Sequence, residues 1–183
     1  MANMSHISTN SPHAWILAAR PKTLTGAAVP VMIGISAAWA DGFFRLVPAL
    51  LCFLFAFLMQ IDANFINDYY DFRKGLDDEK RLGPKRACAE GWITLPAMRR
   101  GIMCTTLLSC LTGLPLVWYG GWTMVLVGVC CVVFCFLYTT CMARLGLGDL
   151  LVLVFFGLVP VGATYYLQSG TVVPEVWALS LAC

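Results

Sequence analysis

The chain has 183 residues, of which 60% are hydrophobic and only 12% are charged. A soluble globular domain carries about 25% charged residues, so this composition excludes an ordinary soluble domain and indicates an integral membrane protein. Twelve Lys and Arg against ten Asp and Glu give a net charge of +2. A charge this small does not indicate a nucleic-acid partner, and we expect the lipid bilayer as the surrounding partner.

The N-terminal segment is predicted to be a tail followed by a short helix. Its first twelve residues contain no Lys or Arg, so we expect a cytoplasmic tail and not a cleaved signal peptide, which begins with a basic region. Ser11 followed by Pro12 is typical of a helix N-cap with Pro at the first helical position. This pair predicts a short helix leading into the first apolar stretch.

Several apolar stretches are long enough to cross a bilayer, which takes about 20 residues of helix. Helices satisfy their own backbone hydrogen bonds in lipid, so each stretch is predicted to be helical. The sequence therefore predicts an all-α transmembrane bundle that forms one domain over residues 1–183. Its five predicted spans and the start of a sixth are Thr23–Trp39, Leu46–Ile66, Ile102–Trp118, Trp122–Ala143, Leu150–Leu167 and Pro174 onward.

Basic residues are concentrated between the second and third predicted spans. By the positive-inside rule this connection is cytoplasmic, and alternation from it leaves only Arg45 of the twelve basic residues on the far side. We expect a multi-pass protein of the inner (plasma) membrane whose N-terminus and hydrophilic loop 67–100 face the cytoplasm. The basic residues of this connection are Arg73, Lys74, Lys80, Arg81, Lys85, Arg86, Arg99 and Arg100.

Small residues recur at every fourth position of the first predicted span, at Gly26, Pro30, Gly34 and Ala38. This spacing places them on one face of a helix and predicts the close approach of a neighbouring helix. We interpret the stripe as packing and assign it no chemistry.

The main chemical feature is a group of oxygen-bearing side chains at the cytoplasmic end of the second span. Asn64, Asn67, Asp68 and Asp71 have the spacing i, i+3, i+4, i+7, so they share one face if the helix continues to Lys74. The following glycine is a natural helix stop. Carboxylate and amide oxygens are what Mg²⁺ prefers, usually one or two carboxylates together with substrate phosphates. The pattern therefore favours a metal site.

The alternative is a solvated helix end, which explains Asp77 to Lys80 well. It explains Asp62, Asn64 and Asn67 poorly, because these lie among apolar residues where polar groups are costly and usually functional. The nearby basic residues suit phosphate oxygens. They also suit attraction to anionic lipid, and the two interpretations are compatible. Arg81 and Arg86 flank a Gly-Pro turn that would aim them back at the helix end.

The run from Gln60 to Asp78, QIDANFINDYYDFRKGLDD, resembles the first aspartate-rich motif of the UbiA superfamily of intramembrane aromatic prenyltransferases. Within that family it is most similar to the branch that prenylates 1,4-dihydroxy-2-naphthoate in menaquinone synthesis. The resemblance covers nearly the whole chain. Further matches are RLGPKR at Arg81–Arg86, EGWIT at Glu90–Thr94, AARPKTL at Ala18–Leu24, GLGDL at Gly146–Leu150 and YYLQSG at Tyr165–Gly170.

The resemblance implies roles for individual residues. Many relatives have another Asp four residues after the position of Asp71, where this chain has Gly75; the naphthoate branch also tends to have Gly there. The implied magnesium ligands are Asn67, Asp68, Asp71 and, more weakly, Asp78, with Asp68 and Asp71 the catalytic pair. Diphosphate binding falls to Lys74, Arg81 and Arg86. The acceptor would contact Arg20, Lys22 and Asn64, although packing or topology setting explains Arg20 and Lys22 equally well.

The implied reaction transfers a polyprenyl group from an allylic polyprenyl diphosphate to 1,4-dihydroxy-2-naphthoate, with release of diphosphate and carbon dioxide, giving demethylmenaquinone. 4-Hydroxybenzoate is an alternative acceptor. Aromatic side chains could shield the allylic cation, although most are expected to be packing or interfacial residues. They include Phe65, Tyr69, Tyr70, Tyr138, Phe155, Phe156, Tyr165 and Tyr166.

Two other classes fit less well. Alcohol phosphatidyltransferases have a D-x-x-D-G-x-x-A-R pattern, whereas Phe72 and Arg73 follow Asp71 here. A cation transporter would place acids near the middle of several spans. Superfamily members have about nine spans and a second aspartate-rich motif, but beyond Glu90 this chain offers only Asp149 and Glu175 as acids. We therefore expect residues 1–183 to be inactive alone, with the sixth span only begun.

Overall fold

The computed structural model describes residues 7–75, 85–140 and 151–181. All regular structure in these ranges is helical, as the apolar composition predicts. The elements are α1 (Pro12–Ala19), η1 (Pro21–Thr23), α2 (Leu24–Ala40), α3 (Leu46–Arg73), α4 (Leu95–Gly113), α5 (Leu116–Gly120), α6 (Trp122–Thr140), the π-helical η3 (Leu153–Leu158), α8 (Val159–Ser169) and α9 (Pro174–Leu181).

Three helical runs in the described ranges are long and apolar enough to cross a membrane: Pro12–Ala40, Leu46–Arg73 and Leu95–Gly120. Two shorter apolar helices follow at Trp122–Tyr138 and Leu153–Ser169. The predicted all-α architecture is confirmed for these residues. The end of the fourth predicted span and the start of the fifth fall outside them.

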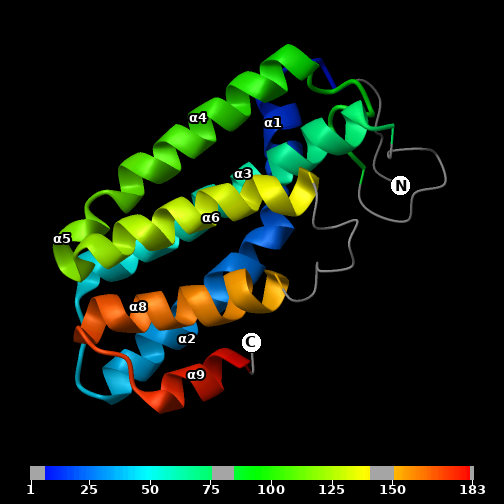
Figure 1. Cartoon of the computed structure of the whole chain (residues 1–183). Helices are drawn as coiled ribbons and strands as arrows, with labels where there is room; N and C mark the ends of the chain where they lie inside the picture. The colour runs from blue at the N-terminus through cyan, green and yellow to red at the C-terminus, as the bar shows by residue number, and fades with distance from the viewer. Residues whose placement is uncertain (1–6, 76–84, 141–150, 182–183) are drawn as a thin grey trace.

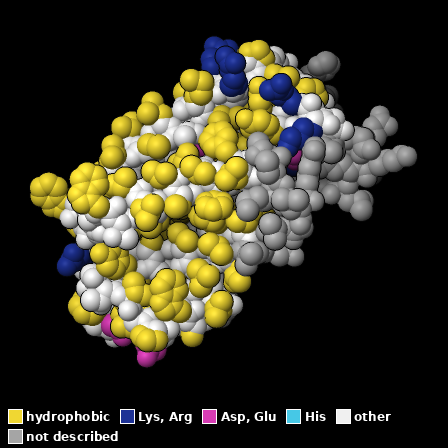
Figure 2. All heavy atoms as spheres, in the orientation of Figure 1, with side chains coloured by type: hydrophobic (Ala, Val, Ile, Leu, Met, Phe, Trp, Pro, Cys, Tyr) yellow, Lys and Arg dark blue, Asp and Glu magenta, His cyan; other side chains and the backbone are white. Residues whose placement is uncertain are grey.

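Helix α3 is the centre of the bundle and contacts α1, α2, α4, α6 and α8. Figure 1 shows the long helices running side by side, with the end of α3 near α1 and the start of α4. Hydrophobic side chains cover the middle of the face seen in Figure 2, and Lys and Arg side chains gather at the α1 and α4 end. This distribution is typical of a protein embedded in a bilayer.

The ends of α3 follow from local sequence. Its N-terminus is fixed from outside the helix, because the amide N–H of Arg45 donates to Oε1 of Gln168 at 2.6 Å. At the other end Lys74 is the C-cap residue and Gly75 has φ +66°. Glycine adopts this left-handed conformation without the steric penalty that other residues carry. The predicted helix end at Lys74 and stop at Gly75 are confirmed.

The helical path is interrupted between α1 and α2 at Arg20. Ser11 caps α1 as predicted, accepting a hydrogen bond from the amide of Ala14 at 3.2 Å. Arg20 has φ 52°, a left-handed conformation that is unusual for a residue with a side chain. Pro21 explains part of it, because the residue before a proline is disfavoured in the α-helical region. The break turns the Arg20 side chain toward α3.

Asp62 connects α3 to α4 through hydrogen bonds inside the bundle. It is fully buried, and its two carboxylate oxygens accept hydrogen bonds from the hydroxyls of Thr105 and Thr106 on α4. Each hydroxyl comes from the neighbouring helix, so the carboxylate links α3 to α4 in a region where water is scarce. Hydrogen bonds between membrane helices stabilise packing by about 0.6 kcal/mol on average and up to about 1.7.

The small-residue stripe of α2 has the predicted consequence most clearly at Gly34, and Ala38 is buried in a cluster with α8 residues. A Cβ on Gly34 would lie 2.7 Å from the carbonyl oxygen of Val161 and 2.9 Å from Cβ of Thr164, both on α8. A Cβ on Gly26 would meet nothing within 4 Å. Gly34 therefore sets the distance between α2 and α8, whereas Gly26 does not.

Replacing Gly34 with Ala should destabilise the fold, because the added methyl would force α2 away from the α8 backbone. Overpacking of this kind typically costs about 1–3 kcal/mol. Gly26→Ala is the matched control and should be neutral or slightly stabilising, since Ala favours the helix. Thermal unfolding in detergent compares the two variants; equal midpoints would contradict a close α2–α8 contact at Gly34.

Candidate functional site

Asp68 lies near the end of α3 and, like Asp62, has no exposed surface. Its Oδ1 lies 3.5 Å from Nη2 of Arg20 and 3.8 Å from Nε of Arg86, and its Oδ2 accepts the amide N–H of Ala87 at 2.9 Å. A buried carboxylate is tolerated only when charges and donors surround it. Asp68 thus ties α3 to the α1–α2 break and to segment 85–94.

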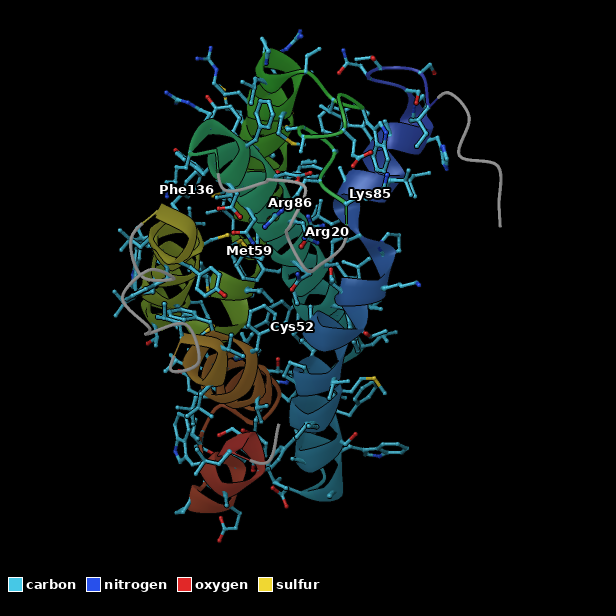
Figure 3. All side chains as sticks on the ribbon, turned by 90° about the vertical axis from the view of Figure 1, so that its right-hand side faces the viewer. Arg20, Cys52, Met59, Lys85, Arg86 and Phe136 are labelled. Carbon is cyan, nitrogen blue, oxygen red and sulfur yellow. The ribbon has the colours of Figure 1, made fainter. Side chains whose placement is uncertain are left out.

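Asp71 lies one turn further along α3 and binds the same arginine. Nη2 of Arg86 donates to Oδ2 of Asp71 at 2.6 Å, a short charge-assisted hydrogen bond. Arg86 is only 7% exposed, while the Asp71 side chain is 20% exposed. Figure 3 shows Arg20 and Arg86 beside each other near the end of α3. Arg86 thus bridges two carboxylates one helical turn apart.

The segment 85–94 forms a cap that holds Arg86 in place. Ala87, Cys88 and Ile93 pack into a buried cluster with residues of α1, α3 and α4. The segment before α1 also binds this cap, because the amide N–H of Asn10 donates to the carbonyl of Trp92 at 2.8 Å. The cap is therefore anchored by apolar packing and backbone hydrogen bonds as well as by charge.

A second polar network lies further into the bundle on the same face of α3. Nδ2 of Asn64 donates to the carbonyl of Ala19 and to Oγ1 of Thr23, each at 2.9 Å. Nε2 of Gln60 reaches Oγ1 of Thr23 at 3.4 Å and Oδ1 of Asn64 at 3.5 Å. Asn64 thereby holds the α1–α2 break against α3, immediately below the Asp68 cluster.

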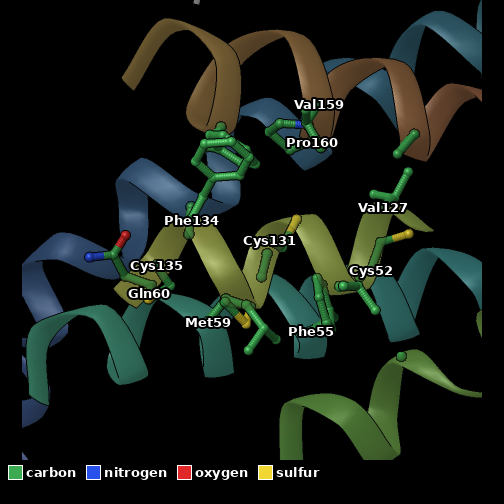
Figure 4. Close-up of a pocket in the computed structure, with 18 of the residues that line it drawn as sticks. Cys52, Phe55, Met59, Gln60, Val127, Cys131, Phe134, Cys135, Val159 and Pro160 are labelled. Atoms are coloured by element: carbon green, nitrogen blue, oxygen red, sulfur yellow. The ribbon is translucent and has the colours of Figure 1, made fainter. Parts of the chain in front are cut away.

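An apolar cavity of about 580 Å³ opens beside these residues. Its walls come from α2, α3, α4, α5, α6, η3 and α8, and Figure 4 shows side chains of α3 facing those of α6 and α8. Asn67 and Gln60 belong to its lining. Of the aromatics considered from sequence, Tyr138, Phe155 and Phe156 line it. Phe65 instead packs edge-on against Trp15, with ring centroids 5.3 Å apart.

The structure brings most of the predicted site residues to one end of α3. Asn64, Asn67, Asp68 and Asp71 share its inner face, and Arg20 and Arg86 meet them from other segments. Two predicted residues lie apart: Lys22 is exposed, and Nζ of Lys74 lies over the ring of Tyr70 at 5.9 Å from its centroid. Asp78 and Arg81 lie outside the described residues.

The donor set suits Mg²⁺ only in combination with a substrate. Within residues 7–75, 85–140 and 151–181, no three His, Cys, Asp or Glu side chains cluster as a metal site. Both oxygens of Asp68 already face arginine or amide donors. Asp71 is partly exposed and Asn67 lines the cavity. These two fit the way Mg²⁺ is usually held, by one or two carboxylates with phosphate oxygens completing the shell.

Comparison with known proteins identifies the family of this chain. Residues 27–183 match the UbiA prenyltransferase family, which is most of the chain. The chain belongs to the UbiA prenyltransferase family. It is 36% identical to 1,4-dihydroxy-2-naphthoate octaprenyltransferase of Escherichia coli over 98% of this chain and 61% of the relative.

Two further relatives extend the comparison. The Haemophilus influenzae protein of the same name is 37% identical over 86% of this chain and 55% of its own length. UbiA prenyltransferase domain-containing protein 1 of Danio rerio is 30% identical over 92% of this chain and 52% of its own length. The chain thus spans between about half and three fifths of the length of these three relatives.

Sequence reasoning about this UbiA chain missed two contributors to the site. Gln60 follows the same helical spacing, one turn before Asn64, so its position was available from periodicity. The backbone amide of Ala87 was not, because no side-chain pattern indicates which amide of a cap will meet a carboxylate.

Arg86→Met should destabilise the cap, because it removes the bridge between Asp68 and Asp71 and leaves buried carboxylate charge less compensated. Loss of one partner from a buried ion pair costs about 3–5 kcal/mol, and we expect the lower end because Arg20 and the Ala87 amide remain. Hydrogen exchange of segment 85–94 and thermal unfolding measure the effect.

Lys85→Met is the matched control for this variant. Lys85 is exposed and pairs with Glu90 at 2.9 Å on the surface, where ion pairs contribute little. It should leave both measurements almost unchanged. Equal protection of residues 85–94 in Arg86→Met and the parent protein would refute the anchoring role of Arg86.

Proposed function

We propose that this protein transfers a polyprenyl group from an allylic polyprenyl diphosphate to 1,4-dihydroxy-2-naphthoate, with magnesium as cofactor. The names of the bacterial relatives support this acceptor. The alternative acceptor is another hydroxylated aromatic acid such as 4-hydroxybenzoate, because identity near 36% is compatible with a change of acceptor.

The observation that carries the proposal is a carboxylate–arginine cluster next to Asn67, which lines an apolar cavity. Asp68, Asp71, Arg20 and Arg86 provide charges suited to a metal diphosphate. The cavity beside them, about 580 Å³, suits an isoprenoid chain. An amphiphile with a diphosphate head and a hydrocarbon tail matches both parts at once.

The reaction begins when the allylic carbon–oxygen bond breaks and the diphosphate leaves with the electron pair. Bound Mg²⁺ would supply positive charge to the leaving oxygens. Arg86, held in position by Asp68 and Asp71, would add fixed positive charge beside them, and Lys74 and Arg81 are proposed to contribute further contacts. Because Arg86 is already oriented, little reorganisation is needed as charge develops.

The ring then attacks the allylic cation at the carbon that bears the carboxylate. Loss of carbon dioxide returns the bonding electrons to the ring, so no proton has to be removed from that carbon. Arg20 is the proposed partner of the acceptor carboxylate, with Lys22 and Asn64 as weaker candidates. Tyr138, Phe155 and Phe156 line the cavity and could stabilise the cation through their π faces.

The proposed membrane arrangement has five spans and the start of a sixth, with the cluster at the cytoplasmic surface. The concentration of Lys and Arg at the α1 and α4 end supports this orientation through the positive-inside rule. A cytoplasmic site would receive a charged, water-borne acceptor from one side and a lipid-borne donor from the bilayer.

The test is a prenyl-transfer assay in membranes that contain the protein. A polyprenyl diphosphate, Mg²⁺ and either 1,4-dihydroxy-2-naphthoate or 4-hydroxybenzoate are added, and the products are identified. We expect the prenylated naphthalene and one carbon dioxide per transfer. Because the chain spans 61% of the Escherichia coli relative, the assay also includes a version joined to the C-terminal remainder of that relative. Product from 4-hydroxybenzoate only would replace the proposed acceptor.

In the active form, Asp71→Ala should lower Mg²⁺-dependent turnover by at least 100-fold with normal membrane insertion, and Asp68→Ala should do the same. Glu90→Ala is the control, because Glu90 is an exposed cap carboxylate that pairs with Lys85. It should retain near-parental turnover. Full activity in Asp71→Ala would remove Asp71 from the metal site.

A further inference from the structure

Gln60 lines the cavity and carries a buried hydrogen-bond acceptor that has no partner. The residue is 9% exposed, and no donor in the described part of the chain reaches its Oε1. A buried polar atom without a partner is destabilising, because it has lost its hydrogen bonds to water. Such atoms in a native structure call for an explanation, and a missing ligand is one.

The orientation of the Gln60 amide follows from fixed backbone groups. The carbonyl of Ala19 can only accept, so the Asn64 nitrogen faces it and the Asn64 oxygen is left facing Gln60. The Thr23 hydroxyl donates to the carbonyl of Arg20 at 2.9 Å, so it accepts from both amides. Gln60 must therefore turn its NH₂ group to this network. Its oxygen is the atom left without a protein partner.

The position of Gln60 lies between the charged cluster and the apolar interior. Eight residues separate it from Asp68, which is about 12 Å along the axis of α3. Figure 4 shows Gln60 at the end of the row of α3 side chains formed with Cys52, Phe55 and Met59. Its cavity-lining neighbours on α3, Met59 and Ala63, are apolar. An ordered water needs two to four polar partners, which this wall does not supply.

The missing partner must carry a hydrogen-bond donor. A polyprenyl chain has none, and the oxygens of a diphosphate at neutral pH are acceptors. A ring hydroxyl is a donor on a flat, largely apolar body that suits the boundary between cluster and cavity. We propose that Gln60 Oε1 accepts a hydrogen bond from a ring hydroxyl of the aromatic acceptor and selects for acceptors that carry one there. This proposal rests on the proposed function.

The consequence is a division of labour within one substrate. Arg20 would hold the carboxylate of the ring at the cluster, and Gln60 would hold a hydroxyl deeper in the bundle. Two contacts fix the rotation of a flat ring, and a fixed orientation brings one carbon toward the allylic cation. Gln60 is thus a binding and specificity residue and takes no part in bond breaking.

The experiment compares 1,4-dihydroxy-2-naphthoate with its dimethyl ether, which keeps the ring and carboxylate but has no hydroxyl donor. Binding of each to the protein in lipid nanodiscs is measured for the parent, for Gln60→Met and for Met59→Leu. One neutral hydrogen bond is worth about 0.5–1.5 kcal/mol, so the parent should prefer the dihydroxy form by about threefold to tenfold. Gln60→Met should bind both forms equally.

Met59→Leu changes a neighbouring cavity side chain without touching a hydrogen bond, and it should keep the parental preference. Gln60→Leu replaces Gln60→Met if the latter unfolds. In the turnover assay the loss should fall on KM for the acceptor and leave KM for the polyprenyl diphosphate within twofold. Both KM values rising together would indicate general disruption and overturn the assignment.

The two proposals fail separately. Prenyl transfer by the parent together with an unchanged dihydroxy preference in Gln60→Met overturns the role of Gln60 and leaves the proposed function standing. A parent protein that neither transfers a prenyl group nor binds polyprenyl diphosphate overturns the proposed function itself.

Discussion

The buried carboxylate of Asp68 is the constraint on which the α1 and α4 end of the molecule depends. A charge with no exposed surface must be surrounded by opposite charge or donors. Meeting that requirement brings together Arg20 from the α1–α2 break, Arg86 from the cap and the Ala87 amide. Three segments far apart in the sequence are thereby fixed around one atom group. The left-handed backbone at Arg20 is part of this arrangement, because it turns the Arg20 side chain toward Asp68.

Helix α3 carries a gradient from charge to hydrocarbon along one face. Asp71 and Asp68 come first, Asn67 and Asn64 follow, and Gln60 is the last polar residue before the apolar wall. An amphiphilic substrate would meet charge, amides and then hydrocarbon in that order. Because α3 is rigid and packed on several sides, each group is held at a fixed depth. The same feature that stabilises the bundle therefore arranges the proposed site.

Periodicity and helix signals predicted much of this framework. The one-face spacing of the oxygen-bearing residues, the Ser11 cap and the stop at Gly75 all depend on interactions within a few residues. The partners of Asp62 and Asp68 could not be predicted, because they lie on other elements and depend on how helices pack. Gly26 and Gly34 share one stripe, yet only Gly34 meets α8. The local pattern predicts which residues share one face of a helix. Tertiary packing determines which of those residues contact a neighbouring helix.

The proposed function depends on whether the cluster of Asp68, Asp71 and Arg86 binds a metal diphosphate. The most direct measurement is calorimetric binding of geranylgeranyl diphosphate and of geranylgeraniol to the protein in nanodiscs, with and without Mg²⁺. We expect Mg²⁺ to tighten diphosphate binding at least tenfold, through Asp71, with no effect on the alcohol. Equal affinity for the two ligands, unchanged by Mg²⁺ and by Asp71→Asn, would show that the cluster only supports the fold.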